Sequence, residues 1–120
     1  MRVAGLGYRS GAALSSLRAL LATAEAMGGP VQALATLPEK VAGLQALGRA
    51  HGVPVLGVAV AGVPTPTQSP RIQALHGTGS VAEAAALAAA GPGARITVAR
   101  ITAPDGMATC AIAESKGQDA

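Results

Sequence analysis

The chain has 120 residues, of which 50% are hydrophobic and 1% aromatic, and its formal net charge is +3. This length suits one compact domain, and the hydrophobic content excludes a disordered chain. Because the nine Lys and Arg residues form no run and Tyr8 is the only aromatic residue, we expect no nucleic-acid partner.

The sequence also argues against metal, cofactor and membrane binding. Cys110 is the single cysteine, so an internal disulfide and a cysteine-rich zinc site are excluded, and its alternating apolar surroundings predict a buried thiol. The longest apolar stretch, 53–63, contains a proline and is too short for a membrane helix of about 20 residues. No signal peptide precedes the first expected strand, and we therefore expect a cytoplasmic protein.

The first half of the chain predicts alternating strands and helices. Residues 2–7 read as a buried strand that ends in glycines, and Ser10 is placed to cap the helix that follows. That helix has an apolar stripe and stops at the "GGP" of 28–30; the stripe consists of Leu14, Leu17, Leu21 and Ala24. Residues 31–37 predict a second strand, Pro38 to Ala50 a second helix ended by Gly52, and 53–60 a third strand.

The second half begins with a proline-rich loop. Three prolines in 61–71 indicate an exposed loop, followed by a short helix over 70–76. The stretch "GSVAEAAALAAAG" predicts a helix in which Ser80 and Glu83 have capping-box spacing. Residues 94–101 and 107–113 predict a hairpin around Asp105-Gly106. We expect a single domain over 1–114 and a loose tail over 115–120.

This order of elements predicts a three-layer α/β/α sandwich. Its mixed sheet would have parallel first strands, joined by right-handed crossovers, and a C-terminal antiparallel hairpin. Ligands of such sheets bind outside the carboxyl ends of the parallel strands. The loops 5–11 and 36–40 leave their strands there, and 76–80 joins them if the strand over 96–101 is also parallel. The sequence therefore predicts a cleft at this edge.

The residues of these loops suit an anion. Glycines permit close approach of the backbone, a helix N-terminus presents free N–H groups, and Arg9 offers a forked donor for a carboxylate or phosphate. A nucleotide is disfavoured, because Ser10 stands where G-x-G-x-x-G requires glycine and no acidic residue follows the second strand cleanly. The candidate ligand-binding residues are Gly5, Gly7, Arg9, Ser10, Thr36, Lys40, Thr78, Ser80 and Glu83.

Purely structural alternatives remain for these residues. The glycines could simply make a tight turn, and Arg9 and Lys40 could be solvated surface residues. A capping box alone would account for Ser80 and Glu83.

Three blocks carry a resemblance to a known family. They are "GLGYRSG", "LATLPEKVAGLQALGRAHGVPV" and "TPTQSPRIQALHGTGSVAEAAALAAAG", with "TCAIA" near the end. The chain resembles the family formed by CobE proteins and the C-terminal domain of CbiG, which belong to cobalamin (vitamin B12) biosynthesis. Tyr8 departs from its pattern, because cysteine is common there, and Ser10 replaces a usual basic residue.

The resemblance implies a role in corrin-ring synthesis, and the length resembles the CobE form of the aerobic pathway. The leading hypothesis is a binder of a corrin or precorrin intermediate. A second is an enzyme acting on the periphery of the precorrin, hydrolase-like as for CbiG, with Lys40, Glu39 or Glu83 as acid–base groups. A third is a structural partner of another pathway enzyme, docking through the loop 63–70.

Overall fold

Five strands form one mixed sheet in the structure, a computed structural model that describes residues 1–116. Its strands are β1 (Arg2–Tyr8), β2 (Ala33–Thr36), β3 (Val55–Gly57), β4 (Arg95–Thr102) and β5 (Ala108–Glu114). The order is β3-β2-β1-β5-β4, with β1, β2 and β3 parallel and β5 antiparallel to both of its neighbours. Strand β4 is therefore parallel to β1, and the carboxyl ends of β1, β2, β3 and β4 lie at one edge.

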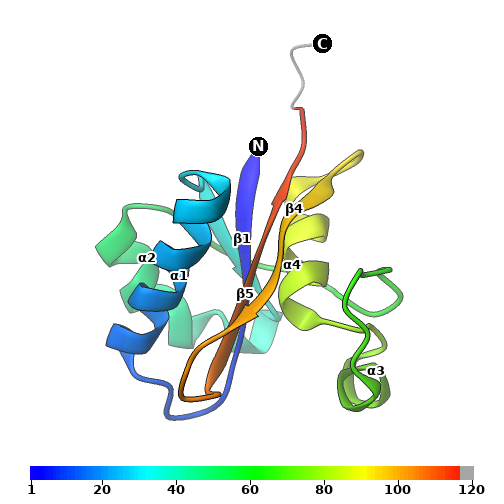
Figure 1. Cartoon of the computed structure of the whole chain (residues 1–120), viewed down its shortest axis with the longest axis horizontal. Coiled ribbons are helices and arrows are strands. Elements are labelled where there is room, and N and C mark those ends of the chain that lie inside the picture. Colours follow the sequence, from blue (N-terminus) through cyan, green and yellow to red (C-terminus); the bar gives the residue numbers. More distant parts are fainter. Residues whose placement is uncertain (117–120) are drawn as a thin grey trace.

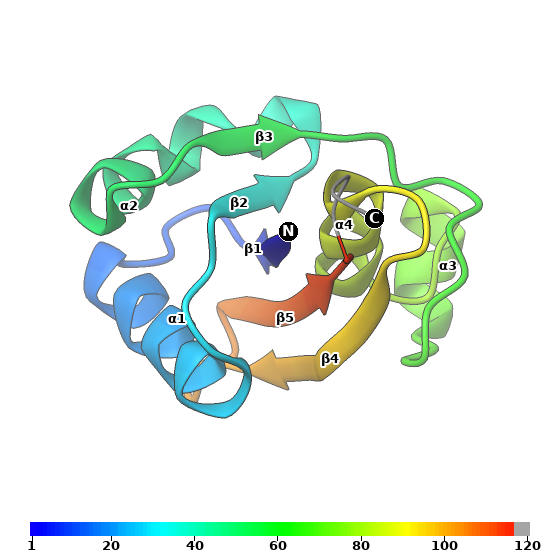
Figure 2. The same ribbon diagram turned by 90° about the horizontal axis from the view of Figure 1, so that it is seen from above.

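Helices cover both faces of this sheet (Figures 1 and 2). Helices α1 (Leu14–Gly28) and α2 (Gln45–His51) cover one face, and α4 (Val81–Ala90) covers the other. The short helix α3 (Pro70–His76) lies beyond α4, at the side of the molecule. The predicted fold class, a three-layer α/β/α sandwich with parallel first strands and a C-terminal hairpin, is confirmed.

The two faces of the sheet are packed differently. The face under α1 and α2 is filled largely by leucines, whereas the face under α4 is filled largely by alanines. Small residues let α4 approach β1 so closely that a Cβ atom at Gly5 would overlap the backbone of Ala82 and Ala86. Gly5 is thus required for helix–strand packing.

Three local predictions were wrong. Helix α1 begins at Leu14 with Ala13 as its N-cap and no side-chain cap, because the chain first turns through Gly11, whose φ is +90°. Ser10 therefore does not cap it. The expected helix from Pro38 to Ala50 is divided into two 3₁₀ turns, η1 (Pro38–Lys40) and η2 (Ala42–Leu44), before α2 begins. The third strand is also shorter than expected.

The remaining elements follow the sequence closely. The short helix over 70–76, the cap of α4 by Ser80 and the terminal hairpin are all confirmed. The Cys110 thiol is fully buried, and burial raises its pKa to about 12. Within the expected tail, Ser115 is hydrogen-bonded to Met1 and Ala90, and 117–120 lie outside the described residues.

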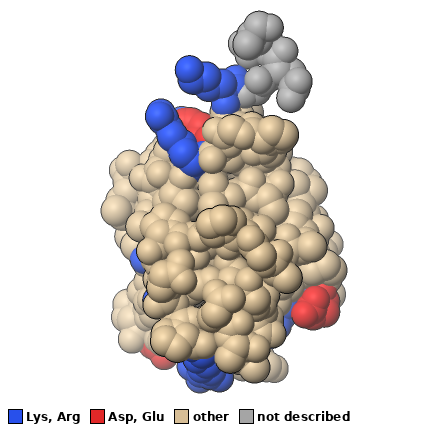
Figure 3. Space-filling model, turned by 90° about the vertical axis from the view of Figure 1, so that its right-hand side faces the viewer, with Lys and Arg blue, Asp and Glu red and all other residues tan. Residues whose placement is uncertain are grey.

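Two surface properties complete the description. The side of the molecule to which α3 contributes is almost without charge over its centre, and both basic and acidic side chains lie around its rim (Figure 3). Among residues 1–116, no helix combines the length and the apolar character that crossing a membrane requires.

Candidate functional site

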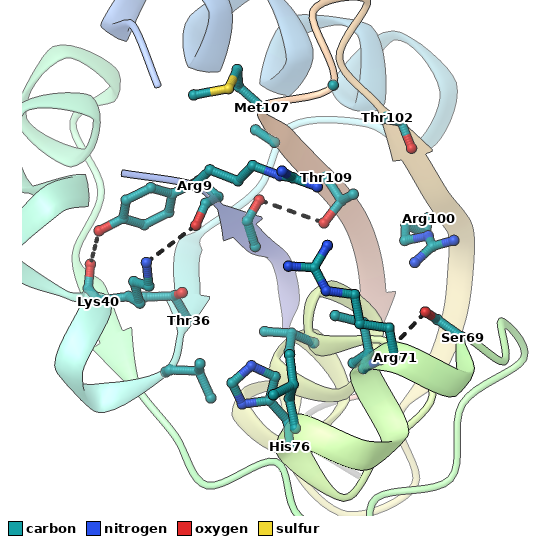
Figure 4. Close-up of a pocket in the computed structure, with 18 of the residues that line it drawn as sticks. Arg9, Thr36, Lys40, Ser69, Arg71, His76, Arg100, Thr102, Met107 and Thr109 are labelled. Atoms are coloured by element: carbon teal, nitrogen blue, oxygen red, sulfur yellow. Dashed lines mark hydrogen bonds between the residues drawn. The ribbon is translucent and has the colours of Figure 1, made fainter. Parts of the chain in front are cut away.

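A cavity of about 550 Å³ lies at the edge of the sheet where β1, β2 and β4 end and β5 begins (Figure 4). The loop after β1 and the turn η1 form one side of it. The other side is formed by α3 and the end of β4, and the hairpin residues Gly106–Thr109 complete the lining. The cavity is therefore at the edge that the topology predicts for ligand binding.

The charges around this cavity are of one sign. Four of the nine Lys and Arg residues line it, together with His76; they are Arg9, Lys40, Arg71 and Arg100. Lys40 and Arg100 lie on opposite sides, with Arg9 and Arg71 between them (Figure 4). Within the described chain, no Asp or Glu belongs to the lining. Such a concentration of cations favours an anionic ligand, and guanidinium groups suit carboxylates or phosphates.

Apolar side chains lie among these cations. Leu37, Ile72, Leu75, Val81 and Met107 contribute to the lining. Leu75 is 62% exposed, although it is a large hydrophobic residue. The cavity thus offers apolar contact as well as positive charge, a combination that is typical of small-molecule sites.

Lys40 is held by Tyr8. The phenol of Tyr8 donates a hydrogen bond of 2.6 Å to the carbonyl of Lys40, and Lys40 Nζ donates one of 3.3 Å to the carbonyl of Tyr8. The ammonium also lies 4.8 Å from the centroid of the Tyr8 ring, within reach of a cation–π interaction. Partial burial raises the pKa of Tyr8, which keeps the phenol a donor at neutral pH.

The strand ends are fixed by hydrogen bonds from side chain and backbone. The Thr36 hydroxyl is buried and donates to the carbonyl of Leu6 at 2.8 Å. The N–H of Arg9 donates to the carbonyl of Met107 at 2.8 Å, which joins the loop after β1 to the hairpin. Both bonds fix the backbone that lines the cavity, and neither requires a bound ligand.

Five of the nine candidate residues line this cavity, namely Gly7, Arg9, Ser10, Thr36 and Lys40. The structure places the other four outside it, in buried packing positions: Gly5, Thr78, Ser80 and Glu83. Thr78 donates to the carbonyl of Val63 at 2.7 Å, and the Ser80 hydroxyl accepts from the N–H of Glu83 at 3.3 Å.

The Glu83 side chain does not close the expected capping box. Its carboxylate is completely buried and accepts hydrogen bonds from residues other than Ser80. Oε1 accepts from the N–H of Thr67 at 2.8 Å, while Oε2 accepts from the hydroxyl of Thr67 at 2.9 Å and from the N–H of Arg100 at 2.8 Å. The capping box is therefore only half formed, and Glu83 joins the proline-rich loop to β4.

Arg71 and Arg100 were not predicted from the sequence. Arg71 is in a short helix with a weak pattern, and Arg100 is in a strand whose alternation points to no ligand. The available signal was topological, since the strand over 96–101 was expected to end at this edge if it were parallel.

A metal centre finds no support in this arrangement. Across residues 1–116, no three His, Cys, Asp or Glu side chains come together in a group that could hold a metal ion.

Comparisons with known proteins agree on one family. The family described as "Cobalamin synthesis G C-terminus" matches residues 2–113. The chain is similar to CobE, a protein from the cobalamin (vitamin B12) biosynthetic pathway, with a TM-score of 0.84 and 31% identity over 98% of this chain and 92% of that chain. It is also similar to the cobalamin biosynthesis protein chiG from Agrobacterium tumefaciens, with a TM-score of 0.71 and 34% identity over 98% of this chain and 100% of that one. No curated protein sequence matches the chain.

Proposed function

The chain belongs to the cobalamin synthesis G C-terminus family of cobalamin biosynthesis proteins, and from this premise we propose that it binds a corrin or precorrin intermediate of the aerobic pathway in the cavity described above. The ligand would be held without being changed and passed on to other enzymes of the pathway.

The charge of the cavity carries this proposal. Corrin intermediates are apolar macrocycles fringed with carboxylates, and the cavity combines four cationic side chains with apolar ones and no acidic lining residue in the described chain. Lys40 and Arg100, on opposite sides, would meet carboxylates on different edges of one ring. Leu37, Ile72 and Leu75 would contact the apolar body of the macrocycle.

Five predicted residues contribute to the proposed site. Arg9 and Lys40 would bind carboxylates directly, and Ser10 would offer a hydroxyl at the rim. Gly7 would keep space for the ligand at the end of β1. Thr36, whose hydroxyl is already bonded to Leu6, would act by fixing the strand end.

The geometry favours binding over a reaction on the macrocycle periphery. Of the acid–base groups considered, Glu83 is buried and bonded to three donors, and Glu39 is not part of the lining. Two groups that could act as acid or base remain in the lining. Lys40 is held against Tyr8, and His76 has no carboxylate partner in the cavity. The described residues that line the cavity do not assemble an acid–base pair, which hydrolysis would need; the pair of His51 and Glu25 lies outside this lining.

An absorbance titration tests the proposal. The purified protein is titrated with hydrogenobyrinic acid and with earlier precorrins, and the ligand is then recovered for mass analysis. A saturable shift with unchanged mass is expected. A changed mass would replace the proposal with an enzyme that acts on the macrocycle, and no shift with any of these ligands would overturn it in favour of a structural role.

Charge removal inside and outside the cavity sharpens the test. Lys40→Ala and Arg71→Ala each remove a charge-assisted hydrogen bond worth about 1.5–3 kcal/mol, which corresponds to an affinity loss of about ten- to a hundredfold. Arg18→Ala removes the same charge from the exposed face of α1 and serves as the matched control. Equal losses in all three variants would show that general charge, and not the cavity, attracts the ligand.

A further inference from the structure

The two segments that carry Arg71 and Arg100, which together form one side of the cavity, are joined by one buried carboxylate. Arg71 belongs to α3 and Arg100 to β4, and both side chains point into the cavity (Figure 4). Glu83 of α4 lies behind them, fully buried, and accepts hydrogen bonds from both the loop before α3 and the backbone of Arg100. No other side chain in the described residues bonds to both segments.

Helix α3 is attached to the body of the protein by one partly buried apolar side chain, Ile72, which packs against the core under α4, and by polar contacts at its ends. None of the residues Pro70–His76 is buried. The ends of the segment are held by backbone bonds from Gly62 to Gly77 and from Ser69 to Gly79, each about as long as an ordinary N–H···O bond, at 2.8 and 2.9 Å. Because Ile72 is the only side chain of α3 among those that pack on this core, the bonds between Glu83 and Thr67 add a second attachment, just before the helix that carries Arg71.

Strand β4, which carries Arg100, is irregular where it is bonded to Glu83. The pairing of β4 with β5 shifts register between Val98 and Ile101, and Arg100 falls within that shift. Its N–H donates to Glu83 Oε2 at 2.8 Å. Irregularities of this kind redirect side chains and often lie beside functional sites. Here the carboxylate fixes the backbone from which the Arg100 guanidinium enters the cavity.

We infer that Glu83 is a positioning residue, whose carboxylate sets the spacing between the cations of α3 and β4 and so the fit of the cavity to its anionic ligand. The consequence for binding rests on the proposed function, whereas the anchoring of the two segments does not. A carboxylate suits this task because it accepts from three donors at once and offers no hydrogen of its own.

The test begins without ligand. In Glu83→Gln one oxygen is replaced by an NH₂ group, which must face at least one N–H or O–H donor. We expect amide hydrogen exchange at Thr67 and Arg100 to accelerate at least tenfold while the amides of β1 stay protected. Glu39→Gln, an exposed carboxylate outside the cavity, is the matched control. Unchanged exchange at both amides would overturn the inference. Should Glu83→Gln not fold, the test uses Thr67→Val, which removes one of the three donors to Glu83. Faster amide exchange at Arg71 and its neighbours in α3 would support the inference, and unchanged exchange there would overturn it.

The binding arm uses hydrogenobyrinic acid as the probe. Glu83→Gln is expected to weaken binding at least tenfold, and to cause a smaller further loss in an Arg71→Ala background, because part of its effect acts through that arginine and the rest through Arg100. Independent, additive losses would overturn the inference, since a merely structural role predicts them. If the unmodified protein binds no macrocycle, the proposed function fails, and the exchange experiment alone decides the role of Glu83.

Discussion

The ring of Tyr8 occupies the space that a side chain at position 43 would need, since a Cβ atom on Gly43 would overlap the phenol oxygen. The phenol can therefore reach the carbonyl of Lys40, and the ring lies beneath the Lys40 ammonium. In this chain a tyrosine and a glycine together hold one of the cavity's cations.

Tyr8→Phe tests the hydrogen-bonded part of this arrangement. The variant loses the 2.6 Å bond to the carbonyl of Lys40 and should lower the free energy of unfolding by about 1 kcal/mol. Gly43→Ala should cost more, because the ring itself must move. Urea denaturation of the two variants measures both effects, and a Gly43→Ala protein as stable as the parent would contradict the packing.

Gly5→Ala and Gly7→Ala separate helix packing from the cavity. A methyl group at Gly5 meets the backbone of α4, which cannot give way easily, so a loss of about 1–3 kcal/mol or more is expected. At Gly7 the nearest atom is the Thr109 hydroxyl at 3.0 Å, and that side chain can rotate. The melting temperature of Gly5→Ala should therefore be well below that of Gly7→Ala. The reverse order would show that α4 is not closely packed on β1.

Ala13→Asp should stabilise the protein. Ala13 is the N-cap of α1, it has extended backbone angles, and the first turn contains no acidic residue. An aspartate there can accept hydrogen bonds from the free N–H groups of the first turn, and its negative charge interacts favourably with the helix dipole. Together these effects are worth about 1 kcal/mol. Ser10→Ala should leave the unfolding free energy unchanged, since Ser10 does not cap this helix. A loss in Ser10→Ala would mean that the helix begins earlier in solution.

Asp105 should contribute to a decline of stability in acid. The Met107 N–H and the Ser16 hydroxyl both donate to its carboxylate and lower its pKa below the ordinary 3.8. A group whose pKa is lower in the folded state stabilises that state above its unfolded pKa, and this contribution is lost as the pH falls through the folded value. Asp105→Asn should therefore show a smaller drop in melting temperature between neutral pH and values below 3.8. An identical drop in both proteins would rule the carboxylate out as a contributor.

Periodicity and turn residues were enough to predict the sheet and most of its helices. The stretch after Pro38 was not predictable from local pattern, because Tyr8, 35 positions before Gly43, packs against it and donates to the carbonyl of Lys40, where the expected helix is interrupted. The start of α1 was misplaced for a related reason: the positive φ of Gly11 delays the helix past the polar residue that resembles a cap.

The site was predicted only in part. The sequence indicates the loops at the ends of β1 and β2, and these loops led to the prediction that Arg9 and Lys40 bind the ligand. Arg71 and Arg100 reach the same cavity through the placement of α3 and an irregular strand, which local patterns do not encode. The role of Glu83 was hidden by its spacing from Ser80, because a capping box already accounted for both residues.

The two ends of the described chain lie beside each other. The N-terminal amine of Met1 donates to the carbonyl of Ser115 at 2.7 Å, and the N–H of Ser115 donates back to Met1 at 2.9 Å. Both residues stand at the edge of the sheet away from the end of β1 where the cavity opens, and Figure 1 shows the N-terminus at that edge. A tag or surface linker attached to the amine of Met1 would emerge on the far side from the cavity. The protein could therefore be immobilised through its N-terminus with the cavity facing the solution.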